Sequence, residues 1–369
     1  MPIGGTYSEN TCCYLSFVVV CGQEKSGRRV PSRDFRQFTP EHRTMTNQSS
    51  GRTVNVSSIF HAAGITSSSV YILETDGMYP YKERVFDNWS YFTAAGFRNL
   101  HECKTFPKTV AIVGIGSGVE GIAAQKVFGR SMRQLVIIDI DDEVVGGARR
   151  NIRRNLPKRN GVLIEPLIGS FCEPLTEQGM RVDLIHANIP NLPAAKGADL
   201  SAGAEKGTFL RSKLYEGYNP PAKYVRWALG AQYAYLQSAR EALTEKGSVL
   251  AEVGGRVPFA ILQELFAECG FTCEEALVGF KVQTEALMDF IGYHEFEEKY
   301  GIAFDFYLYE RSALRLEEFC IEGHVAKMSG NKLKRLLLPY RVSAGAAIEL
   351  CQEGVAVGHI VQILRGARI

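Results

Sequence analysis

Short apolar runs alternate with amphipathic stretches through the middle of the chain, and this alternation limits the fold more than any other feature. The apolar runs are Val110–Ile115, Leu135–Ile138, Val162–Ile168, Val182–Ala187 and Ser248–Val253, and the helical stretches include Glu143–Asn155, Val225–Thr244 and Phe259–Cys269. Strands that are apolar throughout and separated by helices belong to parallel sheets covered on both faces. With a terminal strand pair expected at Glu275–Val282 and Ile302–Tyr309, the sequence predicts an α/β fold with a doubly wound, mostly parallel seven-stranded sheet.

The rest of the chain divides around this core. Residues 1–58 are rich in Gly, Ser, Thr and Arg and have no sustained period, which predicts a poorly ordered N-terminal extension. Met45, inside that segment, is an alternative start. Residues 59–107 are expected to form a small N-terminal cap, residues 108–310 the core, and residues 311–369 a C-terminal extension.

Composition argues against several classes of protein. The 369 residues include 42 Lys and Arg against 40 Asp and Glu, so the formal net charge is +2 and gives no sign of a nucleic-acid or membrane partner. The nine cysteines show neither CxxC nor Cys/His ligand spacing, which predicts no metal site and favours a reducing, cytoplasmic location. The apolar run Tyr14–Cys21 is too short to cross a membrane. We expect a small-molecule substrate as partner, and homo-oligomerisation stays open.

A glycine-rich loop follows the first of these strands. Gly114, Gly116 and Gly118 stand where the backbone must turn tightly before a helix and where a ligand can approach it closely. The next strand ends in Asp139, whose carboxylate can accept both hydroxyls of a ribose. Together these features predict a nucleoside-type cofactor. The spacing Gly116-Ser-Gly118-Val-Glu-Gly121 also allows a dinucleotide, so NAD remains open at this point.

The frame Gly114-Ile-Gly116-Ser-Gly118, with Asp139 and the helix after it, resembles the cofactor loop of the class I S-adenosylmethionine-dependent methyltransferases. The resemblance implies a Rossmann-like methyltransferase core with S-adenosylmethionine as cofactor. The loop would then lie against the cofactor's amino acid part, and Asp139 with Ile140 at its ribose.

Two further positions follow from this resemblance. Ser170 and Phe171, after the third strand, correspond to the adenine edge of the family's site. The chain departs from the family at Ile112, where an acidic residue is common, so the contact to the cofactor's ammonium group must come from elsewhere.

The fourth strand ends in Asn188-Ile189-Pro190-Asn191, which is similar to the Asn-x-Pro-aromatic motif of the family's amino methyltransferases. Asn188 and Pro190 keep that pattern, and the resemblance places Asn188 at the reacting centre and both residues beside the cofactor. The aromatic residue that stacks on a planar acceptor is replaced by Asn191. This replacement favours a small, non-planar acceptor over a base or an amide.

A closer resemblance, over roughly residues 110–310, is to the methyltransferase domain of the methionine S-methyltransferases. It is carried by the Ile-Pro-polar motif together with Val253-Gly254-Gly255-Arg256, Cys269-Gly270-Phe271, Lys281-Val-Gln and Phe304-Asp-Phe. This resemblance implies that the acceptor is the thioether of methionine and that the product is a sulfonium.

A thioether attacks without losing a proton, so such a site needs in-line placement rather than a strong base. Accordingly, His61, His101, His186 and His294 are interpreted as structural or exposed. The candidate catalytic residues are Asn188, Tyr79 and Tyr81, because aromatic faces suit a cationic sulfonium. Tyr215 and Tyr218 are alternatives on the long segment Leu192–Pro221, which is interpreted as a lid carrying Glu205, Lys206 and Glu216 for an amino acid's charged ends.

Three readings therefore remain. The first is methyl transfer to a small amino-acid-like acceptor. The second keeps the fold and the cofactor, but the cofactor's own amine attacks its γ-carbon and yields azetidine-2-carboxylate and methylthioadenosine. The third is a dinucleotide-binding or non-catalytic protein.

Overall fold

The central feature of the fold, in the part of the chain that the structure describes, is a mixed sheet of nine strands. The computed structural model describes residues 51–157, 161–195, 197–319 and 325–369. The strands run in the order β12-β11-β13-β9-β6-β3-β4-β5, and β10 pairs with β13 beside this path. Their bounds are β3 Thr109–Val113, β4 Gln134–Asp139, β5 Leu163–Ile168, β6 Val182–Ala187, β9 Leu243–Gly254, β10 Glu274–Val282, β11 Phe306–Leu308, β12 Arg341–Val342 and β13 Val357–Ala367. The prediction of a mostly parallel, seven-stranded sheet was therefore wrong in strand number, and the pairings that involve β10, β11, β12 and β13 are antiparallel.

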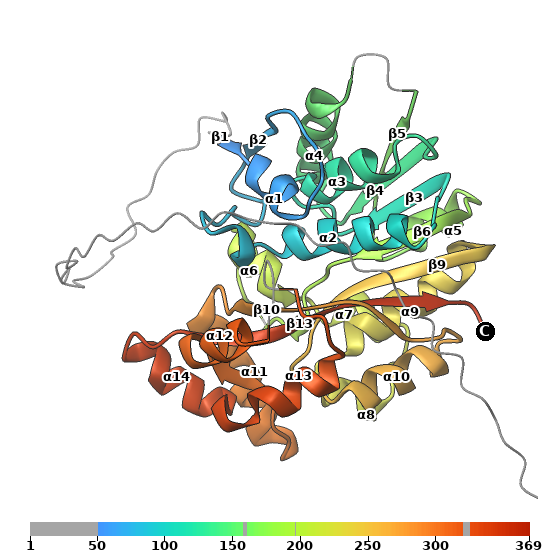
Figure 1. The fold of residues 1–369 in the computed structure, drawn as a ribbon. Helices are drawn as coiled ribbons and strands as arrows, with labels where there is room; N and C mark the ends of the chain where they lie inside the picture. Colours follow the sequence, from blue (N-terminus) through green and yellow to red (C-terminus); the bar gives the residue numbers. More distant parts are fainter. Residues whose placement is uncertain (1–50, 158–160, 196, 320–324) are drawn as a thin grey trace, which may run out of the picture. The chain divides into compact units, whose positions relative to one another are not determined.

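The predicted parallel, doubly wound core is confirmed. Strands β5, β4, β3, β6 and β9 pair in parallel, and alternate residues of β3 enter two different apolar cores. Val110 and Ile112 pack with α2 and α3, whereas Ala111 and Val113 pack with α9 and α10. These two pairs of helices lie on opposite sides of the sheet (Figure 1). The continuous apolar runs in the sequence thus reflect burial on both faces.

The helices connect and cover these strands. They are α1 Ser57–Ala62, α2 Trp89–Glu102, α3 Val119–Phe128, α4 Asp142–Asn155, α5 Glu173–Glu177, α6 Gly203–Thr208, α7 Lys213–Glu216, α8 Ala222–Val225, α9 Gly230–Ala242, α10 Phe259–Glu268, α11 Ala286–Tyr300, α12 Tyr309–Glu317, α13 Gly330–Leu337 and α14 Ala344–Gln352, with 3₁₀ helices at Val85–Asp87 and Leu338–Tyr340. Among the described residues, no helix is both long enough and apolar enough to cross a membrane.

The C-terminal part of the chain belongs to the core, which corrects two expectations. β13 inserts antiparallel between β9 and β10, so residues 311–369 supply a central strand rather than an extension beyond the core. The expected terminal pair of Glu275–Val282 with Ile302–Tyr309 does not form, because β10 and β11 each pair with β13 instead. Ile363 of β13 is fully buried, and Gly96 of α2 lies against it.

The N-terminal cap begins earlier than predicted. β1 (Arg52–Asn55) pairs antiparallel with β2 (Tyr71–Glu74), and α1 starts at Ser57, inside the segment expected to be poorly ordered. Val56 between them is fully buried because it joins the same apolar core as α2. Residues 1–50, and with them Met45 and the run Tyr14–Cys21, lie outside the described residues. The segment Leu192–Pro221 contains α6, α7 and the short parallel pair of β7 (Leu192–Pro193) with β8 (Phe209–Leu210).

Candidate functional site

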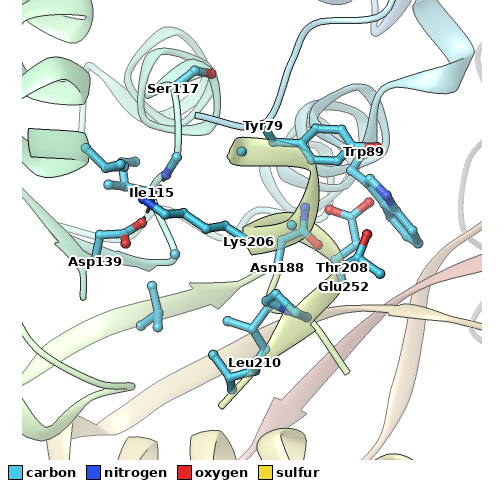
Figure 2. Close-up of a pocket in the computed structure, with 18 of the residues that line it drawn as sticks. Tyr79, Trp89, Ile115, Ser117, Asp139, Asn188, Lys206, Thr208, Leu210 and Glu252 are labelled. Atoms are coloured by element: carbon cyan, nitrogen blue, oxygen red, sulfur yellow. Dashed lines mark hydrogen bonds between the residues drawn. The ribbon is translucent and has the colours of Figure 1, made fainter. Parts of the chain in front are cut away.

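A cavity of about 370 Å³ lies where the parallel strands end at their carboxyl termini. It is centred on β3 and β6, whose onward connections run to opposite sides of the sheet, the place where open α/β sheets bind ligands. Of the residues expected at the site, the following line the cavity: Tyr79, Tyr81, Gly114, Gly116, Asp139, Ile140, Ser170, Phe171, Asn188 and Pro190. Asp139 lies on one side and Glu252 with Trp89 on the other, with Asn188 between them (Figure 2).

The glycine loop leaves open space where a ligand could approach. Gly114 and Gly116 have φ values of +71° and +50°, which side chains rarely adopt. A Cβ added at Gly116 would meet only the carbonyl oxygen of Gly114, at 4.0 Å, so this glycine faces the cavity. Gly118 is not in the cavity wall. A Cβ there would come within 2.9 Å of the Ala148 carbonyl oxygen, so Gly118 lets α3 and α4 pack closely.

Asp139 ends β4 with few hydrogen bonds to its carboxylate. Its two oxygens accept long bonds from the backbone N–H groups of Gly116 (3.4 Å) and Asp141 (3.3 Å). Burial raises the pKa of Asp139 to about 6. Ile140, beside it, is 52% exposed although apolar. The carboxylate of Asp139 can therefore accept further hydrogen bonds, as from the hydroxyls of a ribose. The exposed side chain of Ile140 beside it suits contact with the base of the same nucleoside.

Backbone strain marks the loop after β5. Phe171 has a φ of +49°, a conformation that non-glycine residues rarely adopt. Its side chain is 5% exposed, packs edge-on against Tyr218 and contributes to the cavity wall. Phe171 is thus both a core aromatic and a residue of the cavity wall.

Asn188 follows β6 and is joined to an acid that the motif analysis missed. Its Nδ2 donates to Oε1 of Glu120 at 3.3 Å, and both residues line the cavity. Glu120 stands in the first turn of α3, directly after the glycine loop. Ile112, the position where the family carries an acid, is completely buried in the sheet. Glu120 therefore places a carboxyl group near the glycine loop, which Ile112 cannot do.

Glu120 belongs to a buried cluster with His186, Glu252 and Thr93. His186 Nδ1 lies 3.0 Å from the Leu250 carbonyl oxygen, and its Nε2 lies 3.1 Å from Glu120 Oε2. Thr93 donates to Glu252, and its oxygen lies 3.2 Å from His186 Nε2. Burial, and then the charge of Glu120, raises the pKa of Glu252 well above its ordinary value, which favours the protonated form.

This cluster changes the interpretation of His186 as a lone structural histidine. With Nδ1 donating to a carbonyl, Nε2 and Glu120 Oε2 need a proton or a cation between them. One ligand atom from each of Glu120, His186 and Glu252 lies within 4.8 Å of the others, a donor set that sequence spacing did not indicate. The three residues come from α3, β6 and β9, so no local motif contains them.

The segment Leu192–Pro221 closes one side of the cavity through α6. Gly203 N donates to the Asp76 carbonyl, and a Cβ at Gly207 would strike the ring of Tyr79. Lys206 of α6 lines the cavity and donates to Asp141, the N-cap of α4. Its side chain extends toward the side of Asp139 in Figure 2. Lys206 thus lines the cavity as expected, while four other expected residues on this segment do not: Tyr215, Tyr218, Glu205 and Glu216.

The two predicted catalytic tyrosines lie in the wall and are anchored by hydrogen bonds. Tyr79 donates its hydroxyl to Thr284 Oγ1 at 2.9 Å, and the hydroxyls of Tyr81 and Ser58 are 2.9 Å apart. Burial raises the pKa of Tyr79 well above its ordinary value, so this phenol stays neutral. Neutral aromatic rings can stabilise a cation without acting as bases.

The charged wall beyond Asn188 was also missed. Arg256, Asp289 and Tyr293 line the cavity, and none of them stands in a motif that predicts a ligand contact. Arg256 follows Gly254-Gly255, which the sequence analysis used only as part of a resemblance.

Comparison with known proteins gives distant structural likenesses. No family model and no curated protein matches the sequence. The ribosomal protein L11 methylase of Lactobacillus delbrueckii matches at 19% identity and a TM-score of 0.33, over 55% of this chain and 75% of that one. TrmN of Thermus thermophilus matches at 17% sequence identity and a TM-score of 0.32, over 52% of this chain and 44% of that one. A SAM-dependent methyltransferase of Agrobacterium tumefaciens matches at 14% sequence identity and a TM-score of 0.37, over 56% of this chain and 59% of that one.

This chain spans less than two thirds of the length of the last two proteins. Likenesses this distant carry no argument about activity. The α/β fold rests on the strand order given above, and the function proposed below rests on the residues of the cavity.

Replacing Gly116 by Val should weaken the binding of S-adenosylhomocysteine at least about 10-fold, because the side chain would fill the ligand's space and strain a positive φ. Gly179→Val is the matched control, since Gly179 has a φ of +64° but open surroundings at the surface. Titration calorimetry of both variants separates the effects. Equal affinity in the two variants would contradict the placement of the loop.

Asp139 should also make that binding depend on pH. Its carboxylate would accept both hydroxyls of a ribose only when ionised, so affinity should fall as the pH drops through about 6. A group with this pKa predicts about fourfold weaker binding at pH 5.5 than at pH 7.5. Asp139→Asn should bind more weakly at pH 7.5 and lose this part of the pH dependence. An unchanged pH profile in that variant would remove Asp139 from the site.

Proposed function

We propose that the protein binds S-adenosylmethionine in this cavity and transfers its methyl group to a small acceptor. One observation carries the proposal: Asp139 and Gly116 line the same cavity. Among the described residues, the carboxylate of Asp139 accepts two long hydrogen bonds from backbone N–H groups, and Gly116 faces open space. A nucleoside with a charged tail matches both features. When bound, S-adenosylmethionine supplies a methyl group activated by its sulfonium.

The residues that would hold the cofactor run along the edge of the sheet. Asp139 would accept the ribose hydroxyls, and Ile140, Ser170 and Phe171 would contact adenine. Glu120 is the group that we assign to the cofactor's ammonium, since it is the acid nearest the glycine loop in sequence and lines the cavity. Asn188 keeps the Glu120 carboxylate oriented through its side-chain amide.

The acceptor that we favour is the thioether of methionine. Asn191, in the place of a stacking aromatic, bonds to Gln232 rather than offering a flat face. The aromatic rings that line the far side, Tyr79 and Trp89, suit a sulfonium product. Because a thioether loses no proton, the tyrosines and Asn188 need only place the sulfur in line with the methyl group.

A second reaction is supported by the Glu120–His186 pair. S-methylation needs no proton acceptor, whereas cyclisation of S-adenosylmethionine does. In that reaction the cofactor's ammonium group first gives up a proton to become a neutral amine, the amine attacks the γ-carbon, and the carbon–sulfur bond breaks to release methylthioadenosine. Glu120, hydrogen-bonded to an imidazole, could accept that proton.

Product analysis tests these proposals directly. Incubation with S-adenosylmethionine should give S-adenosylhomocysteine and S-methylmethionine in equal amounts, only when methionine is present. Asn188→Ala should lower turnover far more than cofactor affinity, because a group at the reacting centre acts mainly in the transition state. Asn99→Ala, which removes an amide of α2 outside the cavity, is the control.

Other products would contradict the first choice in different ways. Methylthioadenosine formed without methionine would establish cyclisation. Binding of NAD without S-adenosylmethionine would support the dinucleotide reading. Binding of neither would remove the nucleoside assignment.

A further inference from the structure

A guanidinium group is held in the cavity wall by neutral partners. Arg256 is 4% exposed, and its Nη atoms donate to Tyr293 Oη (3.2 Å) and Gln283 Oε1 (2.6 Å). Nη2 also lies 3.2 Å from His359 Nε2. Burial, and then the charge of Arg256, lowers the pKa of His359 well below its ordinary value, so this ring is a neutral acceptor. Arg256 Nε has no partner among the described residues.

Gln283 lies between this cation and the carboxyl group of Asp289. Its Oε1 accepts from Arg256, and its Nε2 donates to Asp289 Oδ2. Arg256 and Asp289 both line the cavity, yet no direct ion pair joins them among the described residues. A buried Arg and Asp that served stability alone would be expected to pair directly. The amide between them leaves a guanidinium and a carboxyl group side by side in one wall.

The sequence builds this arrangement at the end of β9. A Cβ at Gly254 would lie 2.0 Å from Arg256 Nη1, so only glycine allows the guanidinium to fold back over the strand end. The ring of Tyr293 lies under the guanidinium, 4.9 Å from its central carbon. The group is therefore fixed before any ligand arrives, which lowers the entropic cost of binding.

We propose that Arg256, Gln283 and Asp289 form a subsite for the zwitterionic head of an α-amino acid, with the carboxylate at Arg256 and the ammonium at Asp289. This inference rests on the proposed function for the identity of the ligand. An amino acid carries its two opposite charges on groups bonded to one carbon, and the Gln283 amide bridges the two groups of the wall that would face them. Charge-assisted bonds of this kind are strong and directional.

The position of the subsite favours the acceptor's head over the cofactor's own. Arg256 follows β9, whereas Asp139 ends β4, and the sheet order places β3 and β6 between them. Three strand spacings amount to about 14 Å across the edge of the sheet. The cofactor's amino acid part, lying against the loop after β3, would stop short of β9. An acceptor held at β9 would direct its side chain back toward Asn188.

The protonation of Asp289 can be measured on ligand binding, and it would not change if Asp289 had only a structural role. Burial raises the pKa of its carboxyl to about 7, while the charges of Arg256 and Lys281 oppose that rise and Glu285 adds to it. An ammonium docked on Asp289 would lower this pKa and release a proton. Binding at pH 7 should therefore show an enthalpy that depends on the buffer.

The test uses methionine and two analogues, each lacking one charge, titrated into the protein with S-adenosylhomocysteine present. 3-(Methylthio)propylamine lacks the carboxylate, and 4-(methylthio)butyrate lacks the ammonium. Arg256→Gln should weaken methionine binding about 10- to 100-fold and leave the amine unchanged. Asp289→Asn should weaken methionine similarly, leave the butyrate unchanged and abolish the proton release. Melting temperatures establish that both variants are folded.

Asp183→Asn is the control, since Asp183 accepts the backbone N–H groups of Lys108 and Thr109 away from the cavity. A second arm compares S-adenosylhomocysteine with methylthioadenosine, which has no amino acid head. If Arg256→Gln weakens only the former, the subsite holds the cofactor's own head. If both variants bind every ligand as the wild type does, the proposal is overturned. Failure of methyl transfer is scored separately, by the absence of S-adenosylhomocysteine as a product.

Discussion

Burial of the parallel strands on both faces is the constraint on which the rest of the structure depends. Because β3 sends alternate side chains into two apolar cores, neither face of the sheet is free to hold a ligand. The strand ends are where polar groups can gather without interrupting a core. Gly116, Asp139, Asn188 and Arg256 follow or end four consecutive strands of the sheet, so one edge of the sheet carries these four residues of the candidate site.

The charged groups along that edge have few partners of opposite charge among the described residues. At one end Asp139 has acceptor capacity that the protein leaves unused, and at the other Arg256 has only neutral partners. Between them the buried cluster of Glu120, His186 and Glu252 requires a proton or a cation. Each of these features costs free energy when no ligand is bound, since buried charges are normally paired. A nucleoside with a charged tail and a zwitterionic acceptor would supply the missing partners.

The parts that sequence predicted are those encoded locally. Gly116, Asp139 and Asn188 each directly follow or end an apolar strand, so their positions follow once the strands are recognised. Glu120, Glu252 and Asp289 could not be found in that way, because α3, β9 and α11 bring them to one cavity only in the folded chain. β13 was missed because Gln362 and His359 interrupt its apolar pattern, and both are fully buried only through contacts with distant segments.

A structure of the protein with S-adenosylhomocysteine bound is the most direct test of the central claim. The account predicts both ribose hydroxyls within hydrogen-bonding distance of Asp139, adenine against Ile140 and Phe171, and the ammonium near Glu120. The space between Asn188 and Arg256 should remain available for an acceptor. A ligand bound elsewhere, or one whose ribose does not contact Asp139, would contradict the account.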